Sequence, residues 1–274
     1  MYRSIVNIHM NKEKQVFGTT EWAVKNVNFI SGCQHDCKYC YAKEMAIRFK
    51  RKTTSTWVNE EVNFSKVEPS IRKVNGYVMF PSTHDITPEN VEYSMICLEN
   101  ILASGNDVLI VTKPHFSVIQ MLCTFFSDCK DRILFRFTIG STNSETLRFW
   151  EPNAPSYEER KKCLIYAHSK GFKTSVSCEP MLDITVEEIV SEIEPYVTGS
   201  IWIGKMNHLL KRLKSNGVDD SKTIQRATEL LESQSDKNIR NLYYRLCENP
   251  KVKWKESVKK VIGLDISTEI GVDN

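Results

Sequence analysis

The sequence predicts an α/β fold, a partial (β/α)6 barrel of the TIM type with a helical C-terminal extension. Six short apolar segments of strand length alternate with amphipathic segments of helix length. Strands separated by helices in this way pair in parallel through right-handed crossovers, which favours a partial barrel. The 274 residues, of which 41% are hydrophobic, are sufficient for the core of one such barrel.

The pattern divides the chain into three parts. We expect an N-terminal cover over residues 1–26, the partial barrel over residues 27–204 and a helical extension over residues 205–274. The formal charge is only +3, and the extension carries 14 Lys and Arg against 10 Asp and Glu. This mild excess is typical of a solvated face or of a surface that binds phosphates. We expect the lysines within residues 251–260 to face solvent.

In the first half of the chain, apolar and polar residues alternate at 27–30, which predicts a strand leading through Gly32 into a cysteine-rich loop. The cations Arg48 to Lys52 follow a helical segment, and we interpret them as complementing the negative end of that helix. Thr87 and Pro88 are typical of an N-cap and a first helical position. The other elements expected here are strands at 76–80 and 107–112 and helices at 41–50, from 87 to 105 and at 116–126.

In the second half, capping-box patterns at Ser156 and Thr185 predict two helix starts. We expect no strand beyond Gly204. The expected elements are strands at 132–139, 172–177 and 200–203, helices from 156 to 171 and from 185 to 196, and, in the extension, helices at 220–232, 238–247 and 254–263.

Cysteine usage and the lack of targeting signals indicate the compartment. The chain has nine cysteines, an odd number, and no secretory or transit segment at its first residues. No apolar run approaches the length that crosses a bilayer. We therefore expect a cytoplasmic protein without disulfides and without a membrane partner.

Three cysteines lie close together in one loop: Cys33, Cys37 and Cys40. Three thiolates on a short loop can bind three irons of a [4Fe–4S] cluster and leave the fourth iron open to a small molecule. The alternative is a non-catalytic zinc loop with His35 as the fourth ligand, although zinc sites usually use two short-spaced ligand pairs.

The cysteine spacing, with the aromatic Tyr39 directly before the last cysteine, resembles that of the radical S-adenosylmethionine (SAM) superfamily. The resemblance implies that SAM binds the open iron and that the reduced cluster cleaves it to a 5′-deoxyadenosyl radical, which abstracts a substrate hydrogen atom. It also implies a one-electron reductant protein of the flavodoxin or ferredoxin kind as a partner.

Within the superfamily, the chain is similar to the spore photoproduct lyase and DNA-repair-photolyase-like group. The similarity rests on residues 32–42, on the Thr112-Lys113 pair and on the Glu-Pro to Arg run from Glu151 to Arg160. It implies a substrate that is nucleic acid or nucleotide-derived. The chain departs from the lyase in having no cysteine directly after the strand at 76–80.

The resemblance also implies roles for individual residues. Tyr39 corresponds to the aromatic near the SAM adenine, and Lys113 resembles a contact of the SAM carboxylate. Ser82 and Thr83 stand where the superfamily binds the methionine amino group, and Ser141 resembles a ribose-hydroxyl partner. Loop hydroxyls that satisfy their own turns are the alternative interpretation of the last three.

Further residues at predicted strand exits are candidates for catalysis. Cys178 could donate a hydrogen atom or be a small buried hydrophobe, and Glu179 could bind a polar substrate. His84 and Asp85 could handle protons near SAM or form a local hydrogen-bond pair. For Glu151 and Arg160, outside this group, we expect a structural ion pair.

The sequence thus predicts a radical SAM enzyme with a [4Fe–4S] cluster and SAM as cofactors. Nucleic acid or a nucleotide-derived group is the expected substrate. A peptide or small metabolite is the alternative substrate, and a non-catalytic metal-binding module is the alternative function.

Overall fold

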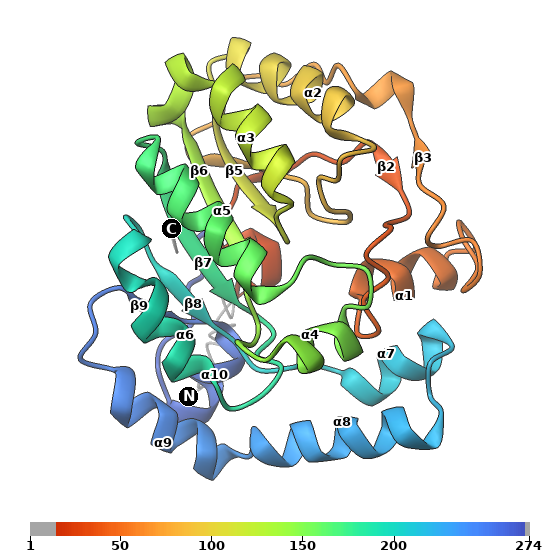
Figure 1. Cartoon of the computed structure of the whole chain (residues 1–274), viewed down its shortest axis with the longest axis vertical. Coiled ribbons are helices and arrows are strands. Elements are labelled where there is room, and N and C mark those ends of the chain that lie inside the picture. The colour runs from red at the N-terminus through yellow and green to blue at the C-terminus, as the bar shows by residue number, and fades with distance from the viewer. Residues whose placement is uncertain (1–14, 272–274) are drawn as a thin grey trace, which may run out of the picture.

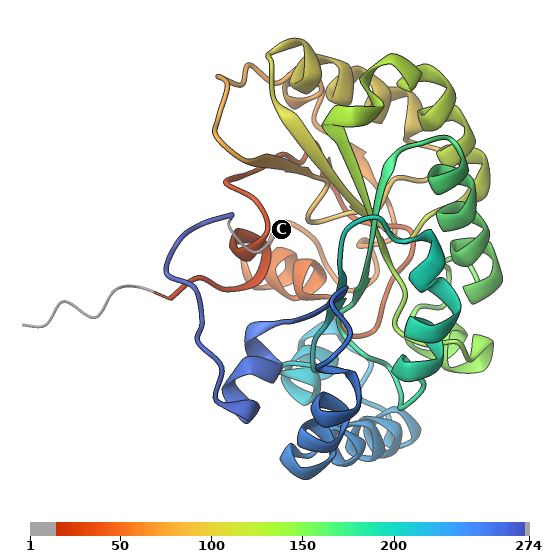
Figure 2. The ribbon, with the colours of Figure 1, turned by 90° about the vertical axis from the view of Figure 1, so that its left-hand side faces the viewer.

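The computed structural model describes residues 15–271 of the chain, so residues 1–14 of the expected N-terminal cover and residues 272–274 lie outside it. A seven-stranded parallel sheet forms the centre, in the order β1-β4-β5-β6-β7-β8-β9. The sheet curves, and α2, α3, α5 and α6 cover its outer side (Figures 1 and 2). The first and last segments of the described chain lie on the inner side (Figure 2). The predicted partial barrel with a helical C-terminal region is confirmed.

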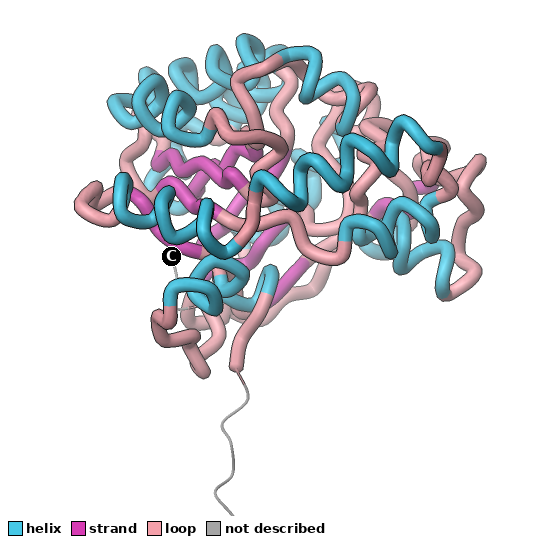
Figure 3. The backbone as a smooth tube through the Cα atoms, turned by 90° about the horizontal axis from the view of Figure 1, so that it is seen from below, coloured by secondary structure: helices cyan, strands magenta, loops and turns pink. Residues whose placement is uncertain are grey.

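The strands of the main sheet are β1 (Lys25–Asn26), β4 (Tyr77–Phe80), β5 (Asp107–Thr112), β6 (Ile133–Thr138), β7 (Lys173–Cys178), β8 (Ile201–Ile203) and β9 (Val252–Trp254). A separate antiparallel pair consists of β2 (Ile30–Ser31) and β3 (Glu61–Val62). The helices, which surround the strands in Figure 3, are α1 (Tyr41–Arg48), α2 (Val91–Ala103), α3 (Phe116–Phe125), α4 (Ser144–Trp150), α5 (Tyr157–Ser169), α6 (Val186–Ile193), α7 (Leu209–Asn216), α8 (Ser221–Ser233), α9 (Asp236–Leu246) and α10 (Glu256–Ile262).

Several predicted elements need correction. The strand expected at 27–30 is divided, because residues 25–26 pair with β4 and Ile30 and Ser31 pair with β3. Asn90, rather than Thr87, precedes the first turn of α2. Helices α4 and α7 were not expected. Both are short, with seven and eight residues, so their apolar periodicity is weak in the sequence.

A strand does occur beyond Gly204, contrary to the prediction. The three residues of β9 pair in parallel with β8, and Val252 and Trp254 are buried while Lys253 is exposed. A three-residue alternation between lysines is too short to indicate a strand, and its pairing partner lies more than fifty residues earlier in the chain. The helical region therefore contributes one of the two edge strands of the main sheet.

Alternation along the strands separates two cores. On β6, Phe135 and Phe137 face the outer helices, whereas Leu134 lies in a smaller inner cluster with Trp22 and Trp202. Since side chains of a strand alternate between its faces, Arg136 and Thr138 also point inward. The Arg136 guanidinium lies beside both tryptophan rings, 4.4 Å from the Trp22 centroid and 5.5 Å from the Trp202 centroid. Trp22 and Trp202 thus fill part of the barrel interior, and Thr138 places a polar group at the carboxyl end of β6.

Lys255 corrects the expectation that the C-terminal lysines face solvent. Its side chain is fully buried, with Nζ 2.7 Å from Glu21 and 3.4 Å from Glu179. The same nitrogen lies 3.9 Å from the centroid of Trp22. Lys255 therefore joins the C-terminal segment to the barrel interior, while Lys253 and Lys260 are exposed.

Within residues 15–271, no helix has the length and apolar character needed to cross a bilayer.

Candidate active site

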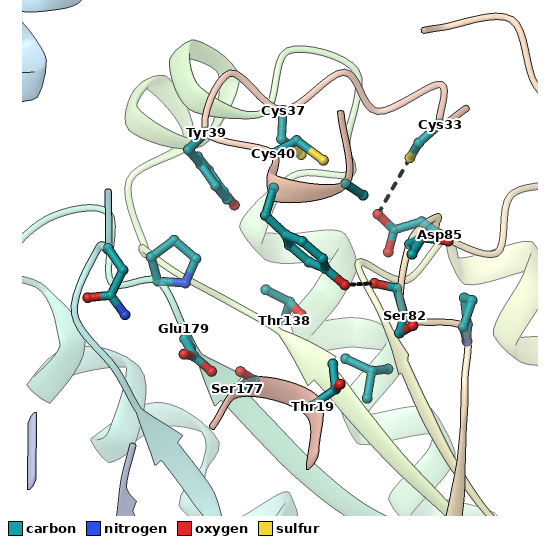
Figure 4. A pocket seen from close by; sticks show the side chains of 18 of the residues that line it. Thr19, Cys33, Cys37, Tyr39, Cys40, Ser82, Asp85, Thr138, Ser177 and Glu179 are labelled. Carbon is teal, nitrogen blue, oxygen red and sulfur yellow. Dashed lines mark hydrogen bonds between the residues drawn. The ribbon is translucent and has the colours of Figure 1, made fainter. Parts of the chain in front are cut away.

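A cavity of about 490 Å³ lies at the carboxyl ends of the parallel strands. This is the edge where ligands bind in such barrels, and the volume is within the usual range for small-molecule sites. The cysteine loop lies on one side of the cavity, and the ends of β4, β6 and β7 lie on the other (Figure 4). Residues that follow β8 complete the wall.

The cysteine loop brings all three predicted metal ligands to this cavity. Cys33 is fixed by its backbone N–H, which donates to Trp57 O at 3.0 Å. Gly32 precedes it with φ +109°, and a Cβ there would lie 2.7 Å from the same carbonyl oxygen. Cys40 is the N-cap of α1 and its sulfur accepts from the Lys43 N–H at 3.4 Å. A backbone contact with Trp57 and the N-cap of α1 therefore position the two ends of the loop.

The two unpredicted helices hold the middle of the cysteine loop. The Lys38 N–H donates to Trp150 O, at the end of α4, at 2.9 Å. The side-chain amide of Asn216, at the end of α7, donates to Lys38 O at 2.9 Å and to Cys40 O at 3.0 Å. Segments far away in the sequence thus determine the conformation of the loop.

Tyr39 is positioned by a buried ion pair. Its ring lines the cavity, and its hydroxyl donates a hydrogen bond to Glu151. Arg160 lies 2.5 Å from the other Glu151 oxygen and also donates to Pro155 O at 2.8 Å. Burial would raise the pKa of Glu151, but Arg160 and Lys113 hold it below its usual value. The expected structural ion pair between Glu151 and Arg160 is confirmed, and it also orients the aromatic ring of the loop.

Asp85 is the centre of a second polar network beside Cys33. One carboxylate oxygen accepts from Thr112 Oγ1 at 2.9 Å and from the Lys113 N–H at 2.7 Å. The other oxygen lies 2.9 Å from His35 Nδ1 and 3.5 Å from Lys113 Nζ. Burial would raise the pKa of Asp85, but Lys113 and His35 keep it well below its usual value. Asp85 is therefore a charged, fixed group.

The geometry of His35 argues against the zinc alternative. Ligand atoms of Cys33, His35 and Asp85 lie within 4.8 Å of one another, which would suit a metal ion. However, His35 Nδ1 faces Asp85, and Nε2 lies 2.8 Å from Nε2 of His115. Both ring nitrogens of His35 are thus already engaged, so His35 is a poor fourth ligand for a zinc ion bound by the three cysteines.

The three thiols fit a metal cluster in their surroundings. Burial is the main factor that raises the pKa of Cys33, Cys37 and Cys40, so without metal they are neutral thiols. Metal binding must displace their protons. All nine cysteines are free, and one loop offers three sulfurs to the cavity. This donor set suits an iron–sulfur cluster with one open iron.

Most of the other predicted site residues also line the cavity: Ser82, Thr83, His84, Asp85, Lys113 and Glu179. The backbone N–H groups of Ser82 and Thr83 donate to the Asn28 side chain at 2.8 Å and 3.0 Å. His84 packs its ring near Phe29 and Phe80, and neither ring nitrogen has a hydrogen-bond partner among the described residues.

The structure does not bring Ser141 and Cys178 to the cavity wall. Ser141 is buried, donates to Asp183 and accepts from the Asn143 N–H at 2.8 Å, so its hydroxyl stabilises its own loop. Cys178 belongs to the outer core, because strand alternation points it away from the interior. Its neighbour Ser177 points inward and lines the cavity instead.

Sequence reasoning missed several lining residues. Thr138 and Ser177 lie at the carboxyl ends of the predicted strands 132–139 and 172–177, so their position was a usable signal. Tyr41, Asn207 and Arg212 also line the cavity, and no comparable pattern marks them. The hydroxyls of Thr138 and Ser177 lie on the wall opposite the cysteine loop (Figure 4).

A parallel partial barrel with a three-cysteine loop at its ligand-binding edge defines a class of metal-cluster proteins. Residues 27–194 match the radical SAM superfamily, which is more than half of the chain. The chain belongs to this superfamily, whose members are enzymes that cleave SAM reductively.

The chain is also similar to individual proteins. An uncharacterized protein of Acidianus two-tailed virus is 27% identical over 211 residues, covering 72% of this chain and 64% of that protein. An uncharacterized protein of Methanocaldococcus jannaschii is 27% identical over 176 residues, covering 62% and 66%. A mutant spore photoproduct lyase with bound AdoMet and dinucleoside spore photoproduct has a TM-score of 0.53 at 15% identity, covering 77% and 66%.

In all three comparisons the match spans just under two thirds of the other protein. At 15% identity, the likeness to the lyase is one of fold.

Proposed function

We propose that this protein binds a [4Fe–4S] cluster through Cys33, Cys37 and Cys40 and cleaves SAM in the adjoining cavity. The observation that carries the proposal is the presence of all three cysteines, and of the Lys113–Asp85 ion pair, on the wall of one cavity. A reduced cluster would supply the electron that cleaves SAM to methionine and a 5′-deoxyadenosyl radical, which abstracts a hydrogen atom from the substrate.

The cavity residues would bind the parts of SAM by their chemistry. Lys113 offers a cation to the carboxylate, and Tyr39 offers an aromatic face to the adenine. Ser82 and Thr83 offer hydroxyl and carbonyl oxygens to the amino group. For the ribose we propose Thr138 and Ser177, because Ser141 is engaged in its own loop.

The candidate catalytic residues would have different roles. Asp85 keeps Lys113 and His35 in place through its fixed charge. Glu179 lines the cavity beside Lys255 and would contact a polar group of the substrate. His84 would take part in proton transfer only if a bound ligand reached its ring, because neither ring nitrogen has a hydrogen-bond partner among the described residues. Cys178 is buried away from the cavity, so we assign it no hydrogen-atom transfer.

The proposed substrate is nucleic acid or a nucleotide-derived group. It is supported by the similarity to the lyase group and by the lyase structure, which contains a dinucleoside. A peptide or small metabolite is the alternative substrate. An experiment with oligonucleotides and unrelated peptides would distinguish the two substrate classes. It measures whether each candidate receives deuterium from 5′-deoxyadenosine or delivers deuterium to it.

Anaerobic reconstitution with iron and sulfide tests the central proposal. The protein should become brown, show the absorbance and electron paramagnetic resonance of a [4Fe–4S] cluster, and release 5′-deoxyadenosine from SAM on reduction by dithionite. A colourless protein that binds one zinc ion and does not react with SAM would instead indicate the non-catalytic metal-binding module.

A further inference from the structure

The outer face of α1 exposes two large apolar side chains. Met45 and Phe49 are 36% and 57% exposed, whereas Tyr41, one turn earlier, lines the cavity and donates to Ser82 O. Residues four apart lie on one face of a helix, so Met45 and Phe49 form a short apolar stripe. An aromatic and methionine stripe of this kind is typical of the central part of a protein–protein interface.

Unbalanced positive charge borders this stripe. Arg48, Lys50 and Arg51 are exposed at the end of α1, and both arginines lie 5.7 Å from the Phe49 ring. The sequence contains no Asp or Glu between Glu44 and Glu60. Although the sequence favours a structural role for these cations, their exposure around an apolar stripe points to a docking role. We call these five residues the α1 surface: Met45, Phe49, Arg48, Lys50 and Arg51.

A neighbouring helix extends the positive charge. Lys211 of α7 is 65% exposed and lies 2.8 Å from Glu44 of α1. Arg212 lies 3.7 Å from the other oxygen of Glu44. One carboxylate is therefore shared by two cations. A surface with this charge attracts an acidic partner and speeds its association.

The α1 surface is close to the proposed cluster. Cys40 is the N-cap of α1, and on the inner face Ala42 and Ala46 pack in one group with Cys33 and Trp57. Only this helix separates the cysteine loop from the exposed stripe, and a helix with its side chains is about 10–12 Å in diameter. The surface is thus near enough to the loop for an electron to pass between bound partners.

The position of the cations favours an electron donor over a substrate. Tyr41 lines the cavity, but Arg48 is seven residues further along the helix, about 10 Å away at the usual helical rise. The cations that could meet a polyanion in the cavity are different ones, Lys113, Lys205 and Arg212, which line its wall. A protein docked at the far end of α1 would leave the cavity accessible to SAM and substrate.

We propose that the α1 surface is the docking site of an acidic one-electron carrier protein of the flavodoxin or ferredoxin kind. One electron leaves the reduced carrier, which is oxidised by one equivalent, and enters the cluster, which is reduced by one equivalent. The inference rests on the proposed cluster, but it concerns how the electron arrives and not whether SAM is cleaved. Such encounters are typically weak, small and dependent on salt.

The test compares a protein reductant with a chemical one. The variant combines Arg48→Glu, Lys50→Glu and Arg51→Glu, and the matched control combines Lys237→Glu, Arg240→Glu and Lys253→Glu, which are exposed residues of α9 and β9. In Figure 1, α9 and β9 lie at the left of the molecule and α1 lies at the right. Both variants change the net charge equally.

Cluster reduction by reduced bacterial flavodoxin, and by reduced ferredoxin, is followed by absorbance. We expect the α1 variant to be reduced by these carriers at least tenfold more slowly than the wild type at low salt, with the dithionite rate unchanged. Binding of oxidised flavodoxin, measured by calorimetry, should weaken by the same factor. The control should match the wild type in all three measurements, and the wild-type rate with flavodoxin should fall as salt increases.

Several outcomes would overturn the docking proposal. The first is that flavodoxin reduces the α1 variant and the wild type at equal rates. The second is that the control variant loses as much of its reduction rate as the α1 variant does. The third is that neither carrier reduces the wild type. A loss of dithionite reduction would place the three cations in the cluster site instead. Loss of oligonucleotide binding with carrier reduction intact would assign the surface to a polyanion. If dithionite-reduced wild type failed to cleave SAM, the proposed function would fail independently of docking.

A second variant, Met45→Gln with Phe49→Gln, leaves the charge of the α1 surface unchanged. It should also slow the reduction of the cluster by the carriers.

Discussion

The Nζ of Lys113 lies 3.5 Å from Oδ2 of Asp85, and the backbone N–H of the same lysine donates to Oδ1 at 2.7 Å. One carboxylate thus fixes both the backbone and the side chain of a cavity-lining cation. Burial would lower the pKa of Lys113, but Asp85 and its other neighbours raise it well above the usual value. The lysine therefore remains charged in the cavity.

Lys113→Ala should weaken SAM binding by about 1.5–3 kcal/mol, the usual range for a hydrogen bond to a charged group. Equilibrium dialysis with the reconstituted protein measures the affinity, and cluster absorbance shows that the metal site is intact. Lys173→Ala, at an exposed position, serves as the control. Unchanged affinity would remove Lys113 from the SAM site.

Replacement of Cys33, Cys37 or Cys40 by alanine should abolish the iron–sulfur absorbance, because the cluster then keeps only two protein ligands. Iron and sulfide analysis after reconstitution measures this loss. The controls are alanine variants at five of the six cysteines outside the loop: Cys97, Cys123, Cys129, Cys163 and Cys247. A need for any of these five would contradict the proposed ligand set.

Gly32→Ala should disturb the cysteine loop. The glycine has φ +109°, and an added Cβ would lie 2.7 Å and 2.8 Å from two backbone oxygens. We expect lower cluster occupancy at equal iron and sulfide, together with a lower melting temperature. Gly263→Ala is the matched control, since Gly263 has φ +78° but no atom within 4 Å of the added Cβ. Equal effects of the two changes would mean that only backbone strain matters.

Glu151→Gln should lower the free energy of unfolding by about 3–5 kcal/mol at pH 7, because the Arg160 charge is left buried and uncompensated. The native pKa of Glu151 lies below its ordinary value of 4.5. Its stabilising effect is therefore complete above pH 4.5 and is lost as pH falls through the native pKa. Urea unfolding should show the two proteins converging in stability below pH 4.5. A second change, Arg160→Met, should restore part of the loss at pH 7.

His84→Phe should remove part of the acid sensitivity of the fold. Burial lowers the pKa of His84 from 6.5 to about 4, so the unfolded chain binds a proton between these values that the native chain does not. Stability should therefore fall as pH falls through this window, by about 3 kcal/mol at most. Urea unfolding at pH 7 and pH 5 should show a smaller decrease in the variant. The same decrease in stability in both proteins would show that His84 is not the source of the acid sensitivity. His168→Phe on α5 is the control.

The sequence was sufficient to predict the parallel strands, because their apolar runs and separating helices form a local pattern. Strand β5 has the predicted bounds, and α5 begins at the predicted capping box, where Ser156 accepts from the Glu159 N–H at 3.3 Å. Membership of the radical SAM superfamily was predictable for the same reason, since three cysteines within eight residues are a local signal.

Tertiary structure decided what depends on distant contacts. Strand β9 exists because β8 offers it a partner, and Lys255 is buried because Glu21 and Glu179 surround it. Strand alternation placed Ser177 inside the barrel and Cys178 outside, which a one-residue change of register would reverse. Local patterns determine which elements form, but a side chain reaches the site only through packing between segments far apart in the chain, and no local pattern contains that information.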